Sequence, residues 1–98
     1  MKIVIHDTNT ACENAPNGNS WIDYWREKVN LDIPSICPCC GQEIEEVVGA
    51  HVINLIALAG KETPQFITPT CKVCNDKYKY SQATKHPFRV EDSMLLKI

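Results

Sequence analysis

Four cysteines arranged as two short pairs carry the strongest chemical signal in this sequence. Cys37 and Cys40 form one C-x2-C pair, Cys71 and Cys74 form a second, and thirty residues separate the two pairs. A C-x2-C turn bends the backbone so that both sulfurs point toward one position, and two such turns supply the four ligands of a tetrahedral metal ion. The spacing therefore predicts that Cys37, Cys40, Cys71 and Cys74 hold a structural Zn²⁺.

Iron is the alternative metal, because four thiolates also bind iron. The segment Cys37-Pro38-Cys39-Cys40-Gly41 is similar to a knuckle of rubredoxin, although rubredoxin-like domains are smaller and carry both knuckles on loops. Cys39 is a minor candidate ligand because it adjoins Cys40. Otherwise Cys12 and Cys39 are left as ordinary thiols.

His51 lies between the two pairs and is the main candidate for further chemistry. Three interpretations stay open: a general base, a hydrogen-bonded residue of the fold beside the zinc shell, or a zinc ligand in place of a cysteine. His6 and His86 are expected at the surface. Tyr78 and Tyr80 are expected to pack on the zinc core rather than to stack on nucleic-acid bases.

The length of 98 residues indicates a single domain, 1–98, with an N-terminal part (1–35), a core (36–80) and a C-terminal part (81–98). So short a chain buries a modest core, and a metal site worth about 10 kcal/mol would matter for its folding. The chain has no apolar run of about 18 residues, so no membrane partner is expected. Its first residues turn polar too early for a signal peptide. We therefore expect a cytoplasmic protein with reduced thiols, which favours metal over disulfides.

Charge is unevenly distributed along the chain, whose net charge is −2. Residues 1–70 contain four basic and nine acidic residues, a balance of −5, whereas residues 71–98 contain six basic and three acidic ones, a balance of +3. The basic region 71–98 could contact the phosphates of DNA or RNA. It could equally compensate for a zinc site that carries about −2 with four thiolates. The acidic segment 1–70 favours a protein partner instead.

Residue patterns predict short strands and two helices around the cysteine pairs. Ser20 is a good N-cap for an amphipathic helix ending near Val29, whose Trp21 and Trp25 are expected to pack in the core. Gly49 is expected to mark a bulge or bend, and Pro69 to end a strand near a sheet edge. The last two strands are candidates for pairing with the first. Strands are predicted at 2–6, 45–53, 65–70, 86–90 and 94–98, and a second helix at 75–81.

The order knuckle, strand, histidine, strand, knuckle, helix is typical of a treble-clef zinc fold. Over about residues 36–80 it resembles the zinc-containing branch of the HNH endonuclease superfamily, in which a strand ends in Asp-His and a second C-x2-C is followed by Asn. The resemblance implies that the four cysteines bind zinc. It also implies that His51 is the general base on the attacking water and that Asn75 lies near a catalytic Mg²⁺ or Mn²⁺.

Departures from this family pattern affect the catalytic half of the motif. Ala50 stands where an Asp usually precedes the histidine, and a methyl group cannot hold Mg²⁺. The usual glycine-rich loop is replaced by the apolar run 53–59, and the middle asparagine has no clear match. The sequence thus predicts an α+β fold, a small zinc-stabilised treble-clef (HNH-like ββα) domain with an N-terminal helix and short terminal strands. The predicted function is structural zinc binding, non-catalytic and nucleic-acid-associated; the alternatives are an active HNH nuclease and a protein-interaction zinc module.

Overall fold

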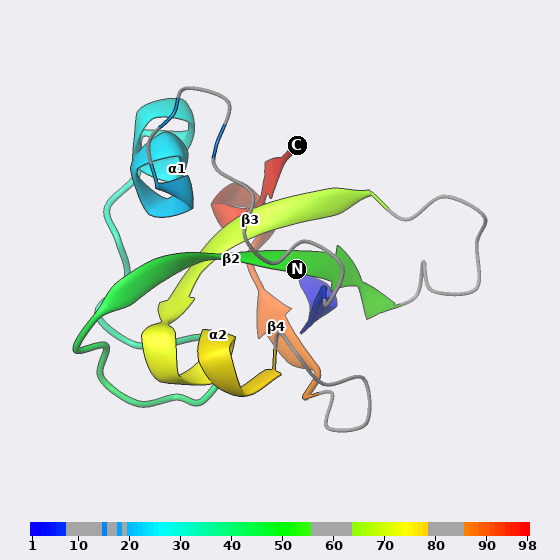
Figure 1. The fold of residues 1–98 in the computed structure, drawn as a ribbon. Helices are drawn as coiled ribbons and strands as arrows, with labels where there is room; N and C mark the ends of the chain where they lie inside the picture. The colour runs from blue at the N-terminus through cyan, green and yellow to red at the C-terminus, as the bar shows by residue number, and fades with distance from the viewer. Residues whose placement is uncertain (8–14, 16–17, 19, 56–63, 79–85) are drawn as a thin grey trace.

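An antiparallel sheet of five strands runs through the described part of the computed structural model, which comprises residues 1–7, 15, 18, 20–55, 64–78 and 86–98 (Figure 1). The strand order is β4-β1-β2-β3-β5, so the first strand lies inside the sheet. The fold is therefore α+β, as predicted. The strands are β1 (Lys2–His6), β2 (Val47–Asn54), β3 (Gln65–Cys71), β4 (Phe88–Val90) and β5 (Leu96–Lys97), and the helices are α1 (Trp21–Val29), α2 (Lys72–Tyr78) and the short 3-10 turn η2 (Asp92–Met94).

The two longer helices lie on opposite faces of the sheet (Figure 1). Successive side chains of a strand point to opposite faces, and β2 shows this clearly. Ala50 and Val52 are fully buried in a cluster that includes the cysteines, on the face covered by α2. Gly49 and His51 alternate with them and face α1, where they contact Trp21. Each face of β2 therefore supports a different layer.

Helix α1 forms where its sequence signals predicted it. The Ser20 side chain accepts a hydrogen bond from the backbone N–H of Asp23, and Asn30 ends the helix in the left-handed conformation (φ 57°). Trp25 is completely buried, and its indole N–H donates to the carbonyl oxygen of Met94 at 2.9 Å. The core-packing interpretation is thus confirmed for Trp25, and the same contact joins α1 to the C-terminal segment.

Gly49 allows α1 to lie very close to the sheet. The register between β2 and β3 runs without a slip from Val47↔Cys71 to Ile53↔Gln65, so Gly49 does not form a bulge. A Cβ atom at this position would lie 2.7 Å from both the backbone nitrogen of Ile22 and the carbonyl carbon of Trp21. Close approach of the helix backbone is therefore the physical reason for glycine here.

The C-terminal half differs from the prediction in three places. Strand β3 continues through Pro69 to Cys71, because β5 pairs only with Phe66 and Ile67 and leaves that edge of β3 unpaired beside the proline. Helix α2 starts at Lys72, before the predicted 75, so that Cys74 lies inside it. Strand β4 pairs with β1 as predicted, whereas β5 pairs with β3. Among the described residues, no helix combines the length and apolar character that a bilayer-spanning segment needs.

Candidate metal centre

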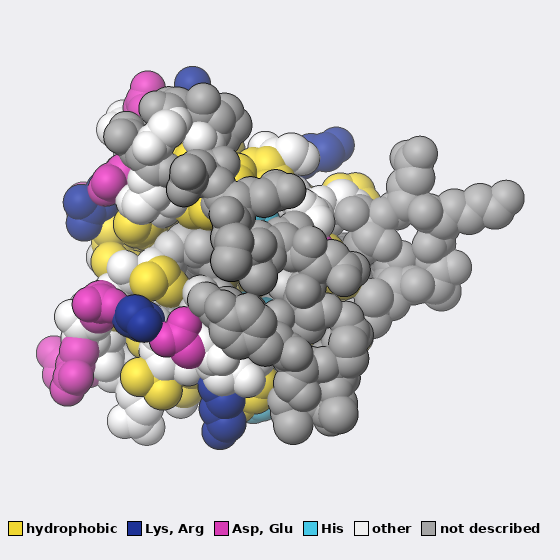
Figure 2. Space-filling view, in the orientation of Figure 1, with side chains coloured by type: hydrophobic (Ala, Val, Ile, Leu, Met, Phe, Trp, Pro, Cys, Tyr) yellow, Lys and Arg dark blue, Asp and Glu magenta, His cyan; other side chains and the backbone are white. Residues whose placement is uncertain are grey.

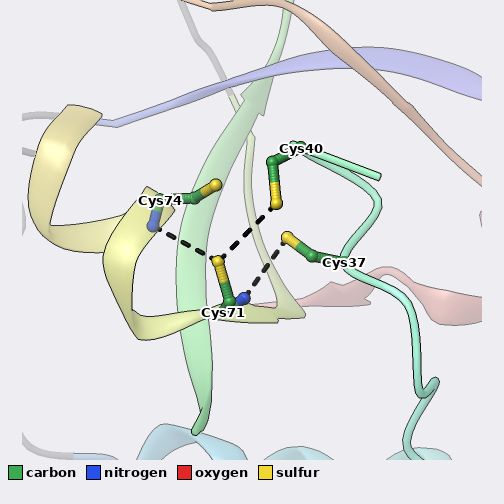
Figure 3. Close-up of side chains that lie close together, drawn as sticks. All are labelled: Cys37, Cys40, Cys71 and Cys74. Atoms are coloured by element: carbon green, nitrogen blue, oxygen red, sulfur yellow. Dashed lines mark hydrogen bonds between the residues drawn. The ribbon is translucent and has the colours of Figure 1, made fainter. Parts of the chain in front are cut away.

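The four predicted cysteines converge on one position (Figure 3). The sulfur atoms of Cys37, Cys40, Cys71 and Cys74 all lie within 4.8 Å of one another, and three of these residues are buried while Cys40 is exposed. The first pair comes from the segment before β2, and the second pair joins the end of β3 to α2. Four sulfurs from two separate segments are thus positioned to bind a single metal ion.

The first pair lies on a tight knuckle stabilised by the backbone. The N–H of Gly41 donates to the carbonyl oxygen of Cys37, and the N–H of Cys37 donates to that of Gln42, both at 2.8 Å. Gly41 has φ +74°, a conformation that side-chain-bearing residues rarely adopt. An isolated bridge between Ile36 and Glu43 closes the base of the knuckle. This local geometry brings the sulfur of Cys40 into the group of four, while the thiol of Cys39 adjoins the group through a hydrogen bond with the thiol of Cys74.

The second pair connects to the first through hydrogen bonds to sulfur (Figure 3). The backbone N–H of Cys71 donates to the sulfur of Cys37 at 3.3 Å, and that of Cys74 donates to the sulfur of Cys71 at 3.4 Å. The sulfurs of Cys40 and Cys71 lie 3.9 Å apart. Backbone N–H groups that point at sulfur stabilise the thiolate, which is the form that binds metal.

Burial and crowding shift the pKa values of these thiols in different directions. Burial acts to raise the pKa of Cys37, but hydrogen bonds from the backbone N–H groups of its neighbours outweigh it and lower the pKa. Burial, followed by the neighbouring thiols, raises the pKa of Cys74, and burial also raises that of Cys71. The raised pKa values mean that all four sulfurs can ionise together only with a cation among them. A bound divalent ion would supply that charge, and the donor set therefore fits a thiolate-binding metal.

Cys39 lies next to the group of four but outside it. Its side chain is buried, and burial raises its pKa to about 11, so it stays a protonated thiol at neutral pH. Its carbonyl oxygen accepts a hydrogen bond from Nε2 of His86 at 3.0 Å. This contact ties the knuckle to the segment before β4. Cys12 falls outside the described residues.

The structure does not bring His51 and Asn75 together. His51 faces α1, where its ring stands nearly perpendicular to the ring of Trp21 with centroids 4.7 Å apart. Asn75 belongs to α2, on the other face of the sheet (Figure 1). The backbone of the sheet lies between the side chain of His51 and the cysteine sulfurs, so His51 is not among the clustered ligands. Ala50, not His51, points toward the α2 face.

Asp7 is a neighbour of His51 that the sequence did not reveal. Its backbone N–H donates to the carbonyl oxygen of His51 at 2.9 Å, which continues the β1–β2 register by one residue. Directly opposite residues share a sheet face, so Asp7 and His51 lie side by side on the α1 face. Gln65 on β3 donates its side-chain amide to the Asp7 carboxylate. Only the strand pairing could show this, because Asp7 and His51 are far apart in sequence.

His6 is buried, and the prediction that it lies at the surface is wrong. It is 2% exposed, and its ring lies between the rings of Tyr78 and Phe88, with centroids 5.7 and 5.4 Å away. Neither ring nitrogen has a hydrogen-bond partner in the described structure. Burial, with a smaller contribution from His86, lowers its pKa to about 4. His86 is exposed, as predicted, and Tyr78 packs against the core, whereas Tyr80 lies outside the described residues.

Comparisons of the chain with protein-family models, with characterised proteins and with solved structures found no match in any of the three. The geometry of the cysteines and their surroundings is therefore the basis on which a function can be proposed.

Proposed function

We propose that this protein is a zinc-stabilised domain of treble-clef type, in which Cys37, Cys40, Cys71 and Cys74 hold one structural Zn²⁺. The observation that carries this proposal is the convergence of four sulfurs, from two C-x2-C pairs, within 4.8 Å of one another; among the described residues the group consists of these four cysteines. Four cysteine ligands close the tetrahedral shell, as in structural rather than catalytic zinc sites. The second pair opens α2 instead of lying on a loop, which favours zinc over a rubredoxin-like iron site.

Metal content in matched cysteine variants tests this proposal. We expect one zinc per chain by elemental analysis of the purified protein, and at least tenfold weaker zinc retention in Cys40→Ser against a competing chelator. Cys39→Ser is the matched control, since it changes the adjacent cysteine, which lies outside the group of four. Its zinc content should equal that of the wild type. Absence of zinc, iron in its place, or equal zinc loss in both variants would contradict the proposal.

The domain is proposed to be non-catalytic. An HNH-type nuclease needs a base and a divalent-metal ligand at one phosphate, but His51 and Asn75 lie on opposite faces of the sheet and Ala50 offers no ligand. We expect no cleavage of plasmid or single-stranded DNA in Mg²⁺ or Mn²⁺. Cleavage that disappears in His51→Ala would establish the nuclease alternative.

Nucleic-acid association is the part of the proposal that rests on the HNH resemblance alone. Of the basic residues predicted to contact phosphate, Lys72 and Lys77 lie on α2 beside acidic side chains, whereas Arg89 and Lys97 lie on β4 and β5 at opposite edges of the sheet. These described cations do not form one continuous face. A salt series of DNA and RNA binding tests the association, since phosphate contacts weaken steeply as salt rises. The cytoplasmic location stays a prediction, which imaging of a tagged protein would check.

A further inference from the structure

A groove of about 680 Å³ opens beside the cysteine cluster, between the first knuckle and α2. One wall comes from the segment between Cys40 and Glu46, and the other from α2. Cys40, the exposed member of the four, lies between the two walls. The two walls belong to separate segments that meet at the cysteines, so the groove depends on the metal site that holds these segments together.

The rim of this groove is predominantly acidic. Glu43, Glu45 and Glu46 are exposed on the knuckle wall, and Asp76 faces them from α2. Two lysines, Lys72 and Lys77, are the basic residues of the lining. The Lys72 ammonium lies 2.7 Å from the Asp76 carboxylate, so these two charges largely cancel. Three glutamates then face one lysine, and four thiolates around a divalent metal would add further negative charge.

An apolar side chain stands within this acidic rim. Val73, on the outward side of α2, is 74% exposed, the highest exposure among the large hydrophobic residues of the described structure. Tyr78 also lines the groove, but it lies about 140° around α2 from Val73 and packs against the core, so Val73 is the outward-facing apolar side chain here. Figure 2 shows acidic, basic and apolar side chains next to one another over the part of the molecule where Figure 1 places α2 and the knuckle. Val73 is therefore an exposed apolar contact point in a groove whose rim carries carboxylates.

We infer that this groove binds a lysine- and arginine-rich peptide segment of a partner protein, with one apolar side chain packed against Val73. The inference rests on the proposed zinc site, because the metal holds both walls in place. Charge complementarity determines the class of partner. Nucleic-acid phosphates would meet the three glutamates and be repelled, whereas basic side chains would pair with them. The groove thus favours a protein partner over DNA or RNA.

Selection from a random peptide library on the immobilised zinc-loaded protein would identify sequences that bind. We expect enriched peptides to carry several Lys or Arg residues around one apolar residue, and their binding to weaken as salt rises. Enrichment of acidic or uncharged peptides, or no enrichment, would overturn the inference. So would preferential binding of an oligonucleotide that competes with the peptides for this groove.

Paired variants locate the binding site. The double variant Glu43→Gln/Glu45→Gln should weaken binding of the selected peptide by about tenfold, since it removes two exposed charge partners. The control Asp32→Asn/Glu91→Gln removes the same charge from exposed positions outside the groove and should leave binding unchanged.

The variant Val73→Ser should weaken binding of the peptide by about fivefold, through loss of an apolar contact. Its matched control is Ile36→Ser, because Ile36 is 51% exposed but does not line the groove. Equal effects in a variant and its control would overturn the inference.

Zinc content and thermal melting of the same samples separate this inference from the proposed function. A folded protein with one zinc that binds no basic peptide overturns the groove inference alone. A protein without zinc overturns the proposed function, and with it the basis of the groove. Variants that keep their zinc and their melting temperature show that any loss of binding comes from the groove surface itself.

Discussion

Each of the three histidines lies in a different environment. The prediction of a surface position is confirmed for His86 and wrong for His6, whereas the sequence leaves the role of His51 open. His86 is exposed and donates a hydrogen bond to the knuckle, His51 packs against Trp21, and His6 is buried between two aromatic rings. His6 ends a short strand, which on sequence grounds is a surface position. It is buried because the rings of Tyr78 and Phe88 pack against its own ring on the α2 face of the sheet.

The burial of His6 predicts a loss of stability in mild acid. Its pKa is about 4 in the folded protein and 6.5 when unfolded, so the unfolded state binds more protons between these values. The stability that the folded protein gains from burying a neutral His6 is fully present above pH 6.5 and is lost as the pH falls toward 4. The loss should reach about 3 kcal/mol. Tyr78 of α2, Phe88 of β4 and His86 face this ring, and no carboxylate is among these groups.

Urea unfolding of the wild type and of His6→Phe, from pH 7 to pH 4, measures this effect. The variant removes the titrating group but keeps an aromatic ring at the site. Both proteins have the same cysteines, so acid protonation of the metal ligands affects both and cancels in the difference. His86→Gln is the control at an exposed histidine, and it should retain most of the wild-type slope. Parallel curves for the wild type and His6→Phe would contradict the prediction.

The cysteine residues were the part of the site that sequence could specify. Spacing identifies C-x2-C pairs because two sulfurs must reach one ion from one turn. Spacing also selected Cys40 over Cys39, and the structure confirms that Cys40 joins the group. What sequence could not specify is the side of the sheet on which a residue between the pairs lies. His51 and Ala50 are adjacent, yet one faces α1 and the other faces the cysteines.

At the scale of elements, local sequence signals predicted which helices and strands exist better than they predicted which strands pair. The Ser20 cap and the helical spacing of Trp21 and Trp25 identified α1 nearly to the residue, because both signals are contained within the helix. The start of α2 was placed too late, since the cysteine turn itself takes part in the helix. The pairing of β5 with β3 depends on contacts between distant segments, which no local pattern encodes.

The contact between α1 and β2 predicts that Gly49 tolerates no side chain. In Gly49→Ala the added methyl group would lie 2.7 Å from backbone atoms of Trp21 and Ile22, so the helix must move away from the sheet. Overpacking of this kind costs about 2 kcal/mol. We expect a lower free energy of unfolding, measured with urea, and an altered near-ultraviolet circular dichroism signal from the tryptophans.

Val48→Ala is the matched control for this substitution. Val48 adjoins Gly49 in β2 but points to the other face, so its truncation should leave the tryptophan signal unchanged while it lowers stability modestly. A Gly49→Ala protein with wild-type stability and tryptophan signal would mean that α1 does not lie against β2 as described.

At the scale of the molecule, one sheet separates two layers that both depend on it. The layer with the cysteines and α2 buries Ala50 and Val52, and the layer with α1 buries Trp25. A domain of this length has a small core on each side. Since both layers use β2 and β3 as their base, stability supplied on one face should support the other face as well.

Metal removal should therefore unfold both layers together. A structural zinc site contributes about 10 kcal/mol, as much as the whole stability of a typical small domain. A chelator added to the zinc-loaded protein should abolish the near-ultraviolet tryptophan signal, although Trp25 lies across the sheet from the cysteines, and zinc should restore it. The far-ultraviolet signal of the strands should fall at the same chelator concentration. Cys39→Ser should show the same transition as the wild type, which excludes a general effect of cysteine loss. If the tryptophan signal survives while zinc is lost, the α1 layer folds without the metal, and the shared sheet does not couple the two faces.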